Sequence, residues 1–366
     1  MAPPNCHPSR VHALAAAVVL ALAGGACRDA PRRVDDWSLA PEGDALVVLD
    51  GHTIELHTPR GAQRVALLAC FPDRNRDHRL VALPTHRALF VSFARVGGNW
   101  VEPSMVDNLT ACLVDFDAGT TTGLRTEFIG DPKRFHPIAG ANSGWLYVAL
   151  LGGGVGVVDL SEGRATSLDI ELAPWRAWTT ETVMTLAESA TTVTVAGLHP
   201  SSRDTHPAIS VTVFDRTTWP PARQRTLSIA IDEEFDELVL SRDGRWLAYS
   251  TPSTATPGAA GLIDATTGEV VFVARPAAAT LDVHDVAVVD DEPFVLATYT
   301  ARGVAGQRDP SPPRLVWLDR RGHAQPRTSR RPPATTIRWL PAFRRGLAAD
   351  YGTIELFTMP PPGAAP

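Results

Sequence analysis

The sequence predicts an all-β protein, a single β-propeller with seven blades of four antiparallel strands each. A motif recurs along the chain at regular spacing, and the segments between its copies are short, apolar and rich in β-branched and aromatic residues. Amphipathic segments with a helical period are few, and 31 prolines and 28 glycines in 366 residues interrupt the chain too often for a helical bundle.

The recurring motif is an apolar run that ends on aspartate, with glycine four residues later. It occurs at Asp115, Asp159 and Asp264, in looser form at Asp215 and Asp319, and with other residues in place of aspartate at His57 and Phe357. The mean spacing of about 50 residues suits four short strands and their turns. We expect each motif to form the hairpin between the third and fourth strands, strands c and d. Aspartate would cap this turn and glycine would adopt positive φ, so we interpret these aspartates as turn residues and not as catalytic acids.

The sixth unit shows the expected strands most clearly, with strands a to d at 284–289, 293–299, 314–319 and 325–329. The last unit lacks an outer strand, because the chain after Phe357 contains three consecutive prolines and proline cannot donate to a strand ladder. A propeller must close its ring. We therefore predict that residues 28–34 supply the missing outer strand.

Two segments resemble known repeats. Residues 241–250 (SRDGRWLAYS) resemble the core of TolB-type and WD-like β-propeller repeats, and residues 144–149 (GWLYVA) with 156–159 (GVVD) are similar to YVTN-type surface-layer repeats. Each resemblance covers a single blade. Together with the signal described next, they imply a bacterial β-propeller lipoprotein, and neither implies catalytic residues.

The N-terminus predicts export. Arg10 and His12 precede the apolar stretch 13–23, which is too short to span a bilayer, and small residues lead from there to Cys27. Residues 1–26 resemble a bacterial lipoprotein signal, which implies that Cys27 is lipidated; the alternative is ordinary cleavage after Ala26. We expect an exported, lipid-anchored protein of the cell envelope, with the propeller at 28–360 and a disordered tail at 361–366. Which membrane holds the anchor stays open.

Two cysteines remain in the predicted propeller, Cys70 and Cys112. We place them in neighbouring blades, and an exported protein is in a compartment that permits disulfides. The alternatives are a bond between them or two buried free thiols.

Linear motifs of chemistry are absent from the sequence. It contains no nucleophile elbow, metal-binding motif or phosphate loop, so we predict no catalytic residue, metal site or cofactor. Asp73 and Asp77 have the spacing of calcium-loop ligands, but His78 and Pro84 stand where such a loop needs glycine and glutamate. The acidic run at 232–237 is interpreted as a solvated loop. A net charge of −6 without a basic stripe argues against nucleic acid as a partner.

The lengths of the predicted b–c connections suggest a working face. They are tight in blades 1, 3 and 7 and long in blades 2, 4 and 6, at 95–110, 198–207 and 301–313. These connections emerge on the same face as the d–a connections, and long loops on a rigid scaffold often carry binding groups. Our candidates on this face are Trp100, Glu102, Asp107, Trp175, Arg176, Trp178, His199, Arg203, Asp204, His206, Arg302, Arg308 and Asp309. The alternative is that the loops are tolerated insertions and the tryptophans pack between blades.

The function that we favour is a non-catalytic binding or scaffold module that meets a protein or glycan of the cell envelope. The alternative is a periplasmic or surface hydrolase or lyase with its site at the mouth of the central channel, because propeller enzymes draw catalytic residues from different blades. Its acid–base candidates are Asp107, His199, Asp204, His206 and Asp309. Two carboxylates, or a carboxylate and a histidine, converging there would favour the enzyme. A third possibility is an array that only spaces or shields an envelope complex.

Overall fold

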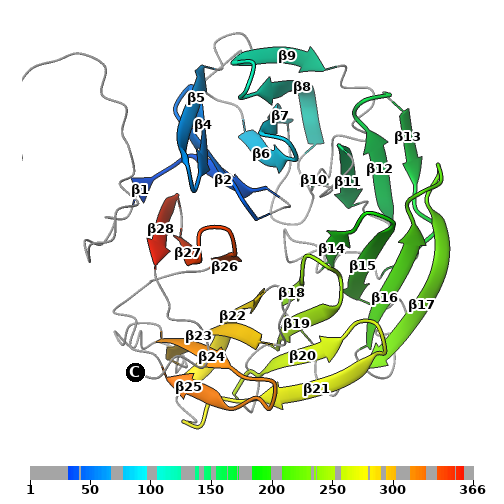
Figure 1. Cartoon of the computed structure of the whole chain (residues 1–366), viewed down its shortest axis with the longest axis vertical. Helices are drawn as coiled ribbons and strands as arrows, with labels where there is room; N and C mark the ends of the chain where they lie inside the picture. Colours follow the sequence, from blue (N-terminus) through cyan, green and yellow to red (C-terminus); the bar gives the residue numbers. More distant parts are fainter. Residues whose placement is uncertain are drawn as a thin grey trace, which may run out of the picture.

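The computed structural model describes residues 32–40, 43–66, 77–96, 105–124, 137–139, 144–149, 154–162, 164–170, 172, 184–198, 208–231, 235, 237–251, 257–278, 281–289, 294–301, 314–326, 336–350 and 352–357. Within these ranges the chain forms seven four-stranded antiparallel sheets arranged in a ring, and no helix (Figure 1). The protein is therefore a seven-bladed β-propeller, as the sequence predicts. Among the same residues there is no helix of the length and apolarity needed to cross a membrane.

Blades 1 to 6 each take four consecutive strands, which pair in sequence order. Their bounds are β2 (Asp36–Leu39), β3 (Leu46–Asp50), β4 (Thr53–Thr58) and β5 (Gly61–Ala66); β6 (Asp77–Leu83), β7 (Arg87–Val96), β8 (Met105–Asp115) and β9 (Thr120–Leu124); β10 (Pro137–Ala139), β11 (Trp145–Ala149), β12 (Val155–Asp159) and β13 (Arg164–Ser167); β14 (Met184–Glu188), β15 (Thr192–Leu198), β16 (Ala208–Asp215) and β17 (Ala222–Ala230); β18 (Glu237–Leu240), β19 (Trp246–Ser250), β20 (Ala260–Asp264) and β21 (Glu269–Ala274); β22 (Leu281–Val289), β23 (Phe294–Ala301), β24 (Arg314–Leu318) and β25 (Ala324–Pro326).

Blade 7 joins the two ends of the described chain. Its sheet runs β1 (Arg32–Arg33), β28 (Thr353–Phe357), β27 (Arg345–Asp350) and β26 (Thr336–Leu340). β1 lies antiparallel to β28, with Arg32 opposite Ile354 and Arg33 opposite Thr353. The predicted closure by the N-terminal segment is thus confirmed at Arg32–Arg33, whereas residues 28–31 of the predicted strand lie outside the described residues.

The aspartates of the repeat motif form the turns between strands c and d, as predicted. Asp115 Oδ1 accepts the N–H of Ala118 at 2.8 Å, and Asp264 Oδ1 accepts the N–H of Thr266 at 2.8 Å. Gly268 follows with φ of +79°, a conformation that favours glycine. Burial raises the pKa of Asp264, but the hydrogen bonds from the hydroxyl and N–H of Thr266 outweigh it and lower the pKa. The carboxylate that caps this turn is therefore ionised.

Neighbouring blades are held together at two levels. Apolar side chains from the facing sheets share buried clusters, such as that of Leu49 in blade 1 and Phe90 in blade 2. The first strands also bond directly from blade to blade. Asp36 Oδ2 accepts the N–H of Leu80 at 2.8 Å, and Thr185 Oγ1 accepts the N–H of Leu240 at 3.1 Å. A polar side chain in the first strand of one blade thus hydrogen-bonds to the backbone of the next blade.

Some predicted strand limits are wrong. β22 begins at Leu281, three residues before the predicted 284, because a register shift between Val283 and Asp285 absorbs one residue and lets the ladder continue. β7 and β8 likewise extend past a register shift between Ser92 and Ala94, so β8 begins at Met105 where a loop to residue 110 was expected. Irregular pairings of this kind lengthen strands beyond what the alternating pattern indicates.

Candidate functional site

One face of the ring collects the b–c connections, and we call it the b–c face. Strand b ends there and strand c begins there, with a tight turn at Gly51 in blade 1 and at Gly352 in blade 7. In blade 4, β15 ends at Leu198 and β16 begins at Ala208; in blade 6, β23 ends at Ala301 and β24 begins at Arg314. These strands flank the long loops that the sequence predicts. These limits match the prediction for both blades.

Most of the candidate binding residues lie outside the described residues: Trp100, Glu102, Trp175, Arg176, Trp178, His199, Arg203, Asp204, His206, Arg302, Arg308 and Asp309. The remaining one, Asp107, lies in β8 opposite Ala94 and not in a loop. Blade 5 also has a longer b–c connection, which the sequence analysis missed. It is closed at its base by the N–H of Thr251, which donates to the carbonyl of Ala259 at 2.9 Å.

A depression of about 390 Å³ opens on the b–c face where blades 7 and 1 meet. It is lined by Arg33, Val34, Asp35, Asp50, Gly352 and Thr353. Two hydrogen bonds hold its rim in place. Asp35 Oδ2 accepts the N–H of Gly51 at 2.7 Å, and the N–H of Val34 donates to the carbonyl of Gly352 at 2.7 Å. The depression presents two carboxylates and one guanidinium to solvent.

Three charged residues meet at the ring centre, and we call Glu237, Asp285 and Arg338 the centre cluster. They come from β18, β22 and β26, the first strands of blades 5, 6 and 7, which contact one another around the ring centre (Figure 1). Arg338 Nη2 donates to Glu237 Oε1 at 3.2 Å, and Arg338 Nη1 lies 3.7 Å from Asp285 Oδ1. The neighbouring carboxyl of Glu237 is one of the groups that raise the pKa of Asp285.

Asp285 is the most deeply buried member of the cluster. Its side chain is fully buried, and burial raises its pKa well above the ordinary value. The carboxyl of Glu237 raises the pKa further, and the charge of Arg338 offsets this only in part. The two oxygens of Asp285 also accept backbone N–H groups, from Val286 at 2.8 Å and from Ile337 in the next blade. Asp285 therefore joins blade 6 to blade 7 by a hydrogen bond to the backbone, as Asp36 joins blade 1 to blade 2.

The centre cluster offers a solute only some of its groups. The side chains of Glu237 and Arg338 are 28% and 30% exposed, whereas Asp285 has no exposed surface. Two carboxyls do converge, as the enzyme alternative requires, but only Glu237 is within reach of a solute. The arrangement can hold a polar ligand between an acid and a guanidinium more readily than it can run acid–base chemistry with two carboxyls.

Sequence reasoning missed all three residues of the centre cluster. The acidic run around Glu237 predicts a solvated loop, and the sequence pattern predicts no role for Asp285 or Arg338. A signal was present, because each is a charged residue within a first strand that is otherwise largely apolar. Such a residue needs a partner when it is buried.

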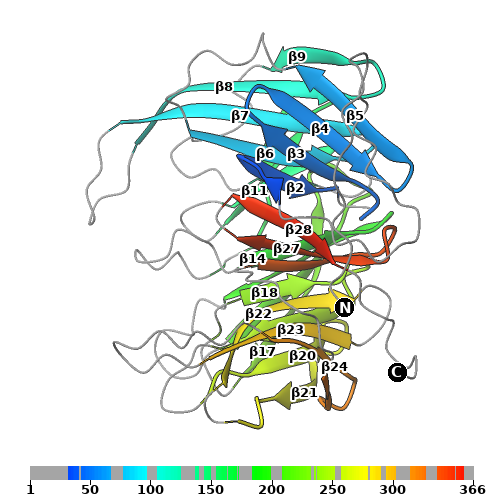
Figure 2. The same ribbon diagram turned by 90° about the vertical axis from the view of Figure 1, so that its left-hand side faces the viewer.

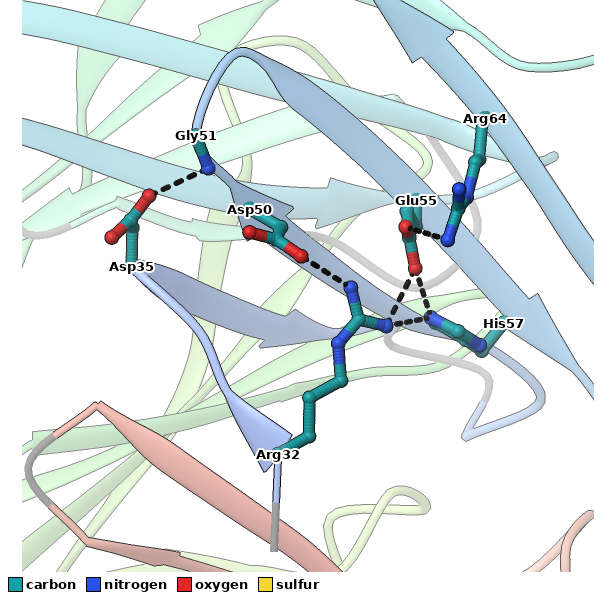
Figure 3. Close-up of polar contacts among 7 residues, drawn as sticks. All are labelled: Arg32, Asp35, Asp50, Gly51, Glu55, His57 and Arg64. Atoms are coloured by element: carbon teal, nitrogen blue, oxygen red, sulfur yellow. Dashed lines mark hydrogen bonds and ion pairs between the residues drawn. The ribbon is translucent and has the colours of Figure 1, made fainter. Parts of the chain in front are cut away.

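A second polar cluster lies where the ring closes, and we call Arg32, Asp50, Glu55, His57 and Arg64 the closure latch (Figure 3). The buried carboxylate of Glu55 receives Arg32 Nη1 at 2.6 Å, Arg64 Nη2 at 2.7 Å and His57 Nε2 at 3.0 Å. Arg32 Nη2 also lies 2.9 Å from Asp50 Oδ2. Arg32 therefore joins the closing strand of blade 7 to two acids of blade 1.

Glu55 is ionised in the latch. Burial raises its pKa, but the hydrogen bond from Arg32 and the charges of both arginines outweigh burial and lower the pKa overall. Burial also lowers the pKa of His57, so its imidazole is neutral at neutral pH. The role of this cluster is structural, because it ties the outer strand of one blade to the neighbouring blade.

Cys112 is disulfide-bonded, which excludes a free thiol at this position. It lies within β8, the third strand of blade 2. Cys70 falls outside the described residues, so the pairing of Cys70 with Cys112 stays a prediction. The described residues hold no group of three or more histidine, cysteine, aspartate or glutamate side chains arranged to bind a metal ion.

The fold is similar to that of two solved structures along nearly the whole chain. The match to hydrazine synthase of Kuenenia stuttgartiensis has a TM-score of 0.53 at 13% identity and covers 92% of this chain and 99% of the other. The match to the Cps50 (Swd1) β-propeller domain of Myceliophteria thermophila has a TM-score of 0.52 at 14% identity and covers 90% and 97%. At such identity the likeness shows the fold alone. No protein family and no curated protein sequence matches the chain.

Proposed function

We propose that this propeller is a non-catalytic binding or scaffold module of the bacterial cell envelope that meets a protein or glycan through the b–c face. The observation that carries this proposal is the unequal length of the b–c connections. Blades 1 and 7 turn tightly at Gly51 and Gly352, whereas segments 199–207 and 302–313 are long and contain charged residues. Extra polar chain on a rigid ring is typical of a recognition surface.

We further propose export and lipidation of Cys27, on the strength of the N-terminal signal. The described propeller begins at Arg32, only five residues after this cysteine. Labelled fatty acid should be incorporated into the wild-type protein and not into Cys27→Ala. Equal labelling of the two proteins, or none in either, would remove the anchor from the proposal and leave the binding face untouched.

Copurification tests the binding face. Full-length tagged protein would be extracted in detergent from the membranes of its own cell, beside the triple variant Arg203→Ala, Asp204→Ala and His206→Ala. The matched control removes the same residue types from exposed or half-exposed positions in hairpins at the opposite end of the blades: Arg60→Ala, Asp117→Ala and His86→Ala. We expect a partner that the loop variant loses and the control retains. A partner that both variants retain, or no partner in a parallel glycan-binding screen either, would contradict the proposal.

The enzyme is a second candidate because the carboxyls of Glu237 and Asp285 both lie beside Arg338 at the ring centre. In this function Glu237 would be the acid–base group, since it is the carboxyl that solvent reaches. A panel of glycoside, lactone and ester substrates should then show turnover that Glu237→Gln abolishes without loss of the folded state. Turnover that is equal in wild type and Glu237→Gln would exclude this site.

A further inference from the structure

Of the seven outer strands that the structure describes, β1 alone does not follow its own blade in the chain. We propose that its attachment is sensitive to acid, so that protonation of Glu55 and His57 in the closure latch releases β1 while the other blades stay folded. The proposal is independent of the proposed binding function and of lipidation. It follows from how little backbone holds β1 and from which charges hold its side chain.

Backbone pairing holds β1 at few positions. The strand has two residues, with Arg32 opposite Ile354 and Arg33 opposite Thr353, and the N–H of Val34 adds one hydrogen bond at 2.7 Å. The other outer strands, β5, β9, β13, β17, β21 and β25, have three to nine residues. Because a pairing as short as that of β1 is not stable by itself in water, β1 depends on its side chains to stay in place.

The side chain of Arg32 supplies this attachment, and it depends on one buried acid (Figure 3). Arg32 lies 2.6 Å from the carboxylate of Glu55 and 2.9 Å from that of Asp50. Arg64 from β5 lies 2.7 Å from Glu55, so that two carboxylates balance two guanidinium groups while Glu55 is ionised. Protonation of Glu55 leaves both guanidinium groups beside the single carboxylate of Asp50, and the attraction that holds β1 to blade 1 weakens.

His57 faces the same charges and responds to acid in the same direction. Its Nε2 lies 3.0 Å from Glu55 Oε2 and 3.4 Å from Arg32 Nη1. Burial lowers the pKa of His57 in the closed ring, whereas release of Arg32 uncovers the imidazole, which then titrates near about 6.5. The released form therefore binds a proton more readily than the closed form, and a fall in pH below about 6.5 favours release.

Glu55 adds to this effect at lower pH. Burial raises its pKa in the closed ring, but the hydrogen bond from Arg32 and the charges of both arginines outweigh burial and lower the pKa overall. The released form again binds the proton more readily, so release is favoured further as the pH falls below about 4.5. Both groups thus weaken the attachment in acid.

The apolar contact between blades 7 and 1 does not titrate. In both views of the ring β28 lies beside the strands of blade 1 (Figure 1 and Figure 2). Ile354 and Leu356 of β28 pack with Leu46 and Val48 of blade 1, whereas Glu355 alternates to the other face of β28. Acid therefore acts on β1 without removing this contact, and the release stays local.

Hydrogen–deuterium exchange of the full-length wild-type protein tests the proposal. Exchange would be measured at pH 7 and at about pH 5, corrected for intrinsic rates, in a peptide that contains Arg32–Val34 and in one that contains β21 (Glu269–Ala274) of blade 5. We expect protection in the β1 peptide to fall several-fold more than protection in the β21 peptide. An equal fall in the two peptides would overturn the proposal, because the release would not be local.

Two variants identify the groups that sense acid. His57→Gln cannot titrate, so the loss of protection between pH 7 and about pH 5 should shrink, and Glu55→Gln should remove the further loss below about pH 4.5. Arg33→Ala, in the same strand, is the matched control and should keep the pH dependence of the wild type. If both glutamine variants respond to pH as the wild type does, the latch is not the acid sensor and the proposal is wrong. Thermal unfolding at pH 7 shows whether the variants are folded; if they are not, the comparison of β1 with β21 in the wild type still decides.

Discussion

Two buried carboxyl groups at different places in the ring show opposite behaviour. Glu55 in the closure latch and Asp285 in the centre cluster are both almost without exposed surface. The pKa of Glu55 is lowered, because the hydrogen bond and charge of Arg32 and the charge of Arg64 outweigh burial. The pKa of Asp285 is raised, because burial dominates and Glu237 adds a second acid. Neighbouring charge, and not burial alone, decides whether an inner carboxyl is ionised.

The difference reflects two ways to join blades. The latch is ionic and near solvent, since the Arg32 and Arg64 side chains are 31% and 54% exposed. The centre cluster relies on backbone hydrogen bonds to one buried carboxyl. Removing the buried acceptor should therefore cost more than removing a half-exposed cation.

The largest expected effect is that of Asp285→Ala. It leaves the N–H groups of Val286 and Ile337 without their acceptor, and we expect the free energy of unfolding to fall by about 3 kcal/mol. Urea denaturation at neutral pH measures this. Asp169→Ala, at an exposed acid paired with Arg223, should cost less than about 0.5 kcal/mol. Similar losses of unfolding free energy in the two variants would show that Asp285 does not hold blades 6 and 7 together.

Arg32→Ala should come next, with a loss of about 2 kcal/mol, because Glu55 stays buried with less compensating charge and β1 loses its tie to blade 1. The adjacent Arg33→Ala is the matched control. Arg33 occupies the same strand but is exposed, and its replacement should cost less than about 0.5 kcal/mol. If the two alanine variants unfold at the same urea concentration, the closure latch does not stabilise the ring.

Lowering the pH should reveal whether the ionised carboxylate of Glu55 stabilises the folded protein. Its folded pKa lies below the unfolded one, so its stabilisation is present above about pH 4.5 and is lost as pH falls through the folded pKa. We expect Glu55→Gln to be less stable than wild type by about 1 kcal/mol at pH 7. Denaturation curves between pH 7 and pH 3 should show this gap closing in acid. A gap that widens in acid would mean that Glu55 is protonated in the latch.

The smallest effect is expected for Glu237→Gln. The folded pKa of Asp285 is raised, so its stabilising contribution is complete below about pH 3.8 and is lost as pH rises through the folded pKa. Glutamine removes the second acid and so lowers the folded pKa of Asp285. The unfolding free energy that is lost between acid and neutral pH should therefore shrink by about 0.5 kcal/mol. The readout is the slope of unfolding free energy against pH. A steeper slope in Glu237→Gln would show that Glu237 does not raise the pKa of Asp285.

The fold is predictable because its signals are local. Each Asp-x-x-x-Gly turn is formed by residues within one hairpin, as at Asp115 and Asp264, and the seven copies of the motif, counted with its looser forms, give the blade count. The closing strand was also predictable, because the prolines after Phe357 exclude an outer strand at that end. Both inferences need only neighbouring residues and the requirement that the ring close.

The polar clusters are less predictable because their members meet across blades. Nothing close to Glu237 in the sequence points to Arg338, two blades away, and Arg32 pairs with Glu55 only after the ring direction is known. The start of β8 was misplaced for a related reason: the register shift near Ala94 depends on the partner strand and not on the pattern of either strand alone. Apart from Asp107, the residues proposed for binding fall in sequence segments that carry no periodic signal.

The closure latch has a consequence for the order of folding. β1 is synthesised first and its partner β28 last, and at 5–20 residues per second about 16–65 s of synthesis separates them. The acids that hold Arg32 belong to blade 1, which is made immediately afterwards. β1 can thus pack against the first blade early and be in place before β28 is made. The last strand then completes the ring by adding to an edge that is already in position.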